Sequence, residues 1–79
     1  SSALPTRYKQ FKNLEILDLT RCQLTKMPDL RGNVQLKKLV LIENKLTLTN
    51  DQLSPLPRLE ELNLQKNNIN VLPEAIGQY

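Results

Sequence analysis

The chain has 79 residues, so it can form at most one small domain, with a core close to the lower size limit for independent folding. Eleven basic and eight acidic residues, with no histidine, give a mild net charge of +3. The basic residues form no run with interleaved aromatics, and no stretch of about 18 apolar residues is present, so we expect neither nucleic-acid binding nor membrane insertion.

An eleven-residue pattern occurs three times along the chain, and its copies begin at Leu14, Leu36 and Leu59. Each copy reads Leu-x-x-Leu-x-Leu-x-x-Asn-x-Leu, with Cys in place of Asn in the first copy and Ile in place of the last Leu in the third. The steps between copies are 22 and 23 residues. A period of this size indicates a repeat architecture, in which each unit buries its apolar face against its neighbours.

Apolar and other residues alternate around the middle leucines of each copy, in the ranges 16–20, 38–42 and 61–65. A period of two sends successive side chains to opposite faces of a strand, so we predict a short strand in each range. A helix would also accommodate Leu-x-x-Leu, but Leu17 and Leu19 would then point apart by about 200°. The leucines are therefore expected on one face of a sheet.

The segments between the predicted strands are short and must return compactly to the start of the next strand. Range 49–53 has Thr, Asn and Asp as cap residues before Gln-Leu, and range 72–77 has a proline suited to a first helical turn and a glycine as a stop. We expect a short helical or 3₁₀ turn in both ranges. Range 31–33 is expected to be an irregular return.

Both ends of the chain match parts of the repeat. Tyr8 and Phe11 precede Leu14 by the offsets at which Ile76 and Tyr79 would precede a further copy. We expect residues 1–79 to be one segment of a longer array, with flanking repeats or sister domains covering both ends, since each repeat needs neighbours. Its units are a partial repeat, two full repeats and an incomplete one, at residues 1–13, 14–35, 36–58 and 59–79.

The three copies resemble the leucine-rich repeat family over almost the whole chain. The resemblance implies an α/β repeat fold. This fold is a right-handed solenoid with a short parallel sheet on the concave face and irregular, 3₁₀ or short helical returns on the convex face. It also implies that the ninth position of each copy turns the chain out of the strand and bonds backbone groups of adjacent repeats. An amide suits that role because it both donates and accepts. The residues of this structural ladder are Cys22, Asn44 and Asn67.

The sequence offers no set of residues for catalysis, and we expect a protein that is not an enzyme and has no metal or cofactor. Without a second cysteine or a histidine, Cys22 can form neither a Cys–His pair nor a zinc site, and we expect a buried structural cysteine. Glu60 and Glu61 are adjacent on a strand and face opposite ways. Two glycines do not provide a phosphate-binding loop.

Residues between the inward leucines form the solvent side of the predicted sheet, where equivalent positions line up in rows about 4.8 Å apart. Val40 and Ile42 are apolar where exposure is expected, and Ile16 lies on the neighbouring strand. An apolar patch inside a charged rim is typical of a protein-binding surface, although β-branched residues also simply suit strands. The expected protein-binding residues are the four rows Ile16, Lys38 and Glu61; Asp18, Val40 and Asn63; Thr20, Ile42 and Gln65; and Arg21, Glu43 and Lys66.

Our leading hypothesis is a non-enzymatic protein–protein interaction module that binds a protein on its concave sheet. The alternative is a regulatory or sensing segment of a larger multidomain receptor or signalling enzyme, such as an intracellular immune receptor. Range 24–30 resembles repeats of intracellular plant resistance receptors, and range 72–77 resembles endings found in intracellular signalling and bacterial repeat proteins. The lone cysteine and the lack of an Asn-x-Ser/Thr sequon favour a cytoplasmic location over an extracellular receptor.

Overall fold

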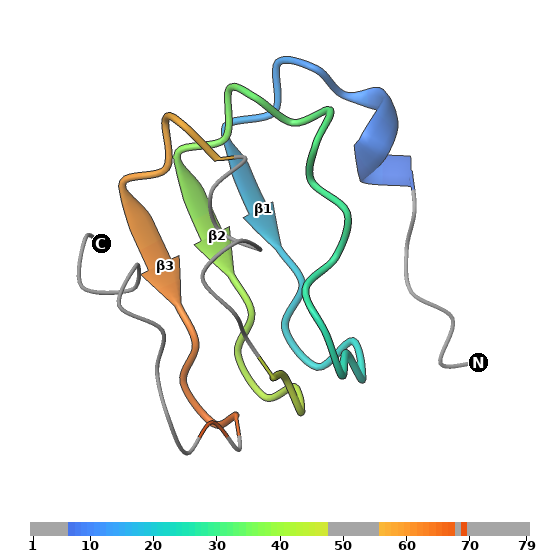
Figure 1. Ribbon diagram of the computed structural model, residues 1–79, viewed down its shortest axis with the longest axis vertical. Helices are drawn as coiled ribbons and strands as arrows, with labels where there is room; N and C mark the ends of the chain where they lie inside the picture. Colours follow the sequence, from blue (N-terminus) through green and yellow to red (C-terminus); the bar gives the residue numbers. More distant parts are fainter. Residues whose placement is uncertain (1–6, 48–55, 68, 70–79) are drawn as a thin grey trace.

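The computed structural model describes residues 7–47, 56–67 and 69. The described chain begins with a 3₁₀ helix, η1 (Arg7–Gln10), and continues through strands β1 (Ile16–Asp18), β2 (Lys38–Val40) and β3 (Glu61–Asn63). The strands form one parallel sheet in the order β1-β2-β3. Figure 1 shows them side by side, each followed by a turn at its carboxyl end.

The register of the sheet follows the sequence repeat. Leu39 pairs with Leu17 on one side and with Leu62 on the other, so each position lies beside its equivalent one repeat away. This confirms the three predicted strands, although each is three residues long rather than five. A second parallel contact ties the returns together, because the Lys45 N–H donates to the Leu24 carbonyl at 2.8 Å.

The expected returns are tested only in part. Residues 31–33 form an irregular turn, as predicted. Ranges 72–77 and 49–53 lie outside the described residues. Within the described part of the chain, η1 is the only helical element, and the sequence had given no reason to expect it there.

Leucines from successive repeats share one core inside the coil. The most completely buried belong to the middle repeat, where Leu36, Leu39, Leu41 and Leu46 are at most 1% exposed. The middle repeat has a neighbour on both sides, which explains its deeper burial. Burying each such side chain stabilises the fold by about 1.5–3 kcal/mol. The buried core consists of Tyr8, Leu17, Leu19, Leu24, Leu30, Leu36, Leu39, Leu41, Leu46, Leu56 and Leu59.

The prediction that Val40 is exposed is wrong. Its side chain is 8% exposed, yet it is not part of the leucine core. Val40 lies on the central strand, between Asp18 and Asn63 in the register. A short β-branched side chain with cross-strand neighbours on both sides is covered by them. Val40 is therefore covered by neighbouring side chains on the side of the sheet opposite the leucine core.

The chain leaves each strand through a left-handed turn. Arg21, Glu43 and Lys66 occupy equivalent positions and have φ of 55°, 58° and 60°, and Gln23 has φ of 58°. This conformation costs about 1 kcal/mol or more for a residue with a Cβ atom. The residue that follows each of the three equivalent positions is the predicted ladder residue, so the turn sets the direction in which the ladder side chain leaves the backbone.

Candidate functional site

A buried asparagine joins the second repeat to the first. Asn44 is 5% exposed, and its Oδ1 accepts hydrogen bonds from the backbone N–H groups of Cys22 and Leu24, both at 3.0 Å. Its Nδ2 donates to the carbonyls of Leu19 at 3.1 Å and Leu41 at 2.9 Å. One amide thus satisfies backbone groups of two repeats that the bend would otherwise leave unpaired.

The same arrangement recurs one repeat later and changes at the first ladder position. Asn67 accepts from the Leu46 N–H at 3.1 Å and donates to the Leu41 and Leu64 carbonyls, both at 2.9 Å. Cys22 has no side-chain amide, and its Sγ lies 3.6 Å from the carbonyl oxygen of Thr20 in its own repeat. Cys22 is half-buried rather than buried, which corrects the expectation.

Another buried asparagine, Asn33, which the sequence reasoning missed, joins the first full repeat to the partial repeat before it. The side chain of Asn33 is fully buried, and its Nδ2 donates to the carbonyls of Tyr8 at 2.9 Å and Phe11 at 3.3 Å. These bonds hold η1 against the coil. The available signal was a polar residue at the position that holds Phe11 in the preceding repeat and Leu56 in the next.

Six of the twelve predicted binding residues lie in the strands and alternate with the inward leucines, and the other six follow the strands, where backbone hydrogen bonds continue the pairing of adjacent repeats. We call the surface that these twelve residues form the open sheet face. Val40 alone among them is buried. The exposed members are Ile16, Asp18, Arg21, Glu61, Gln65 and Lys66, and the half-buried ones are Thr20, Lys38, Ile42, Glu43 and Asn63.

Most charges on the open sheet face are paired across strands. Lys38 Nζ lies 3.2 Å from Glu61 Oε2, and Lys66 Nζ lies 3.7 Å from Glu43 Oε1. Exposed pairs of this kind contribute only about 0–1 kcal/mol each. Their main effect is that the central and third strands present little net charge to a partner.

The one carboxylate of β1 is also engaged. Asp18 accepts hydrogen bonds from the hydroxyl of Thr20 at 2.6 Å and from its backbone N–H at 2.9 Å. These bonds, first the hydroxyl and then the backbone, with a smaller contribution from the charge of Lys38, lower the pKa of Asp18 below its ordinary value. The carboxylate therefore stays ionised and held in place at neutral pH.

The apolar part of the open sheet face is smaller than the sequence suggested. Ile16 is 62% exposed, Ile42 is half-buried and Val40 is covered. The two accessible isoleucines belong to different rows, separated by the row that contains Val40. The face therefore offers one strongly exposed aliphatic side chain at its margin rather than a continuous apolar patch.

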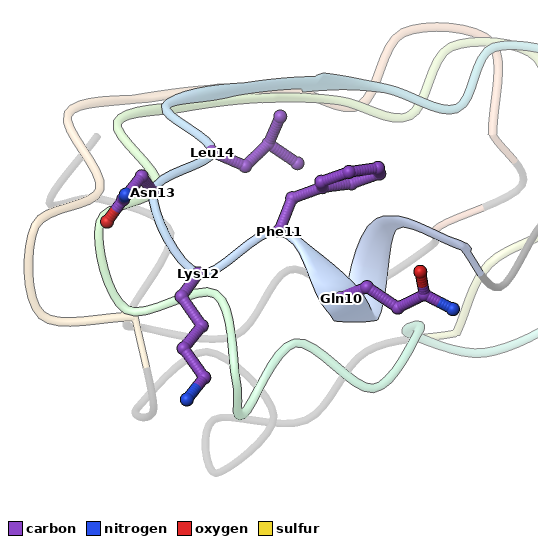
Figure 2. Close-up of a pocket in the computed structure, with 5 residues that line it drawn as sticks. All are labelled: Gln10, Phe11, Lys12, Asn13 and Leu14. Atoms are coloured by element: carbon purple, nitrogen blue, oxygen red, sulfur yellow. The ribbon is translucent and has the colours of Figure 1, made fainter.

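A hollow near the start of the described chain carries no comparable arrangement. It is lined by residues 10–14, between η1 and β1. Figure 2 shows the Phe11 and Leu14 side chains close to each other, with Lys12 pointing in a different direction. Phe11 is 49% exposed. No polar groups converge there, so the hollow provides no evident chemistry for a small ligand.

The described residues contain no group of three or more His, Cys, Asp or Glu placed to hold a metal ion. No helix in the described part of the chain has the length and apolar character needed to cross a bilayer.

The sequence profile of the leucine rich repeat matches residues 12–69, which include all three copies of the pattern. The chain belongs to the leucine-rich repeat family. No curated protein matches its sequence. Leucine-rich repeat domains generally mediate protein–protein interactions and are typically not enzymes. The three-stranded parallel sheet with its asparagine ladder fits this family.

Proposed function

We propose that this leucine-rich repeat segment binds a protein partner through the open sheet face. The proposal rests on the order of this face: its rows are fixed by strand register, four of its six charged side chains form ion pairs, and Ile16 remains 62% exposed at its margin. A rigid polar surface with an exposed aliphatic side chain suits protein recognition, because little side-chain freedom is lost on binding.

The proposal includes the expectation that the open sheet face is the concave side of a right-handed solenoid. A partner inserted against a concave sheet would contact several rows at once. In that geometry Ile16 and Gln65, on the first and third repeats, would lie on opposite margins of one interface. Both side chains are exposed, and changing them should leave the leucine core and the ladder unaltered.

The test compares affinity capture by the wild-type chain with capture by a face variant, Ile16→Asp with Gln65→Arg. A control variant makes matched changes away from the face, Val34→Asp with Gln10→Arg, at two other exposed positions. Circular dichroism melting establishes that both variants fold. Captured proteins, quantified by mass spectrometry, should be retained by the control and reduced by about tenfold or more with the face variant. Equal retention by a folded face variant would reject the open sheet face as the binding surface.

A further inference from the structure

The turns that follow the three strands carry an excess of positive charge. The turns comprise residues 19–26, 41–47 and 64–67. They contain four cations, Arg21, Lys26, Lys45 and Lys66, and one anion, Glu43. All four cationic side chains are exposed. Figure 1 shows the three turns together along the lower edge of the view, at the carboxyl ends of the strands.

Only one of these cations has a carboxylate partner in the described part of the chain. Lys66 pairs with Glu43 at 3.7 Å. Arg21, Lys26 and Lys45 form no ion pair with any described residue. We call these three side chains the basic rim.

Backbone hydrogen bonds fix the basic rim on adjacent turns. The Arg21 N–H donates to the Ile42 carbonyl at 2.9 Å, and the Lys45 N–H donates to the Leu24 carbonyl at 2.8 Å. Lys26 lies in a parallel bridge beside Thr47. Unpaired like charges on neighbouring turns create a positive potential, which an anionic partner would relieve.

The row of residues directly before the strands carries no excess of positive charge. The row that precedes the strands is Glu15, Lys37 and Glu60, which alternates in sign, and Lys37 pairs with Glu15 at 3.5 Å. The other described cations without an ion pair to a described residue are Arg7, Lys12 and Arg58. A variant that lacks these three separates the effect of the basic rim from that of the general positive charge.

We infer that the basic rim docks an acidic, extended segment of the protein partner, with Asp or Glu side chains that pair with Arg21, Lys26 and Lys45. This inference rests on the proposed function, since it names the chemistry of the partner at the margin of the open sheet face. Nucleic acid is a poorer fit, because the described turns carry no aromatic side chain for base stacking.

The direct test uses a fluorescein-labelled peptide of alternating Glu and Ser, a Gln and Ser peptide of the same length, and a single-stranded oligonucleotide. The rim variant is Arg21→Gln with Lys26→Gln and Lys45→Gln. The control, Arg7→Gln with Lys12→Gln and Arg58→Gln, removes the same charge from exposed positions elsewhere. Fluorescence anisotropy should show that the acidic peptide binds the rim variant about tenfold or more weakly than it binds the wild-type chain. Its affinity for the control variant should fall by less than about twofold.

Three results would overturn the inference. The first is an equal loss of affinity for the acidic peptide in the rim and control variants. The others are wild-type binding of the Gln and Ser peptide as tight as that of the acidic peptide, and wild-type binding of the oligonucleotide tighter than that of the acidic peptide. The capture experiment with the rim variant separates this inference from the proposed function. If the face variant loses its captured proteins and the rim variant keeps them all, the rim inference fails while the proposed function stands. If the rim governs acidic-peptide binding and the face variant captures normally, the proposed function fails instead.

Discussion

The side chain of Asn44 donates a hydrogen bond to the carbonyl of Leu19, 25 positions earlier in the chain, at 3.1 Å. The bond spans two neighbouring repeats. Together with the hydrogen bonds that its Oδ1 accepts from two backbone N–H groups, this bond makes the Asn44 side chain a buried polar link between the first and second repeats, in addition to the backbone hydrogen bonds between them. Loss of the amide would leave buried backbone donors and acceptors without partners.

Asn44→Ala should lower the free energy of unfolding by about 3 kcal/mol, because unpaired buried polar groups cost about 1–3 kcal/mol and several are left here. Urea denaturation monitored by circular dichroism measures the change. Asn13→Ala, at an exposed position, is the control and should change stability by less than about 0.5 kcal/mol. Similar losses in the two variants would show that the ladder at Asn44 is not a principal source of stability.

The repeat pattern predicted the features that each repeat determines by itself. Alternation placed Leu39 in the core, because it depends only on residues within one copy. The resemblance to the leucine-rich repeat family, rather than the pattern alone, implied that Asn44 lies at the bend. The burial of Val40, the bonds of Asn33 and the position of η1 depend on what the neighbouring repeat contributes. Period and alternation carry no information about those contacts, so the sequence could not provide them.

Gln23→Gly should stabilise the protein by about 1 kcal/mol. Gln23 is exposed and has φ of 58°, in the left-handed region where a Cβ atom is strained and glycine is not. Relief of that strain should outweigh the extra freedom that glycine gives to the unfolded chain. Thermal melting provides the measurement.

Gln35→Gly is the matched control for the glycine change, since Gln35 lies in a turn but is not among the positive-φ residues. There the glycine only increases the entropy of the unfolded chain, and stability should fall by about 0.5–1 kcal/mol. A fall in stability for both variants would contradict the argument from backbone strain.

Asn33→Ala should lower the free energy of unfolding by about 2 kcal/mol, less than Asn44→Ala, because fewer backbone groups lose a partner. Asn33 donates to two carbonyls, while its own Oδ1 has no partner among the described residues. The loss should appear first at η1. Hydrogen exchange of the η1 amides should accelerate more than that of the β2 amides. Uniform acceleration across both elements would show that Asn33 does not act chiefly by holding η1.

The acid sensitivity of the fold should depend on Asp29. Its carboxylate accepts two hydrogen bonds from the Arg31 guanidinium, at 3.0 Å and 3.1 Å, and one from the Arg31 N–H at 3.2 Å. These bonds, with smaller contributions from the charges of Arg31 and Lys9, lower the pKa of Asp29 from 3.8 to about 2. Because the pKa is lower in the folded state, the stabilisation is complete above pH 4 or so and is lost as the pH falls toward about 2.

Asp29→Asn and Arg31→Gln should each therefore flatten the dependence of stability on pH between about 4 and 2. The asparagine cannot ionise, and without the guanidinium the carboxylate loses most of the bonds that favour its charged form. Urea midpoints measured across this range for the wild type and both variants test the expectation. If all three proteins lose stability in parallel as the pH falls, other carboxylates govern the acid response and the Asp29–Arg31 pair does not.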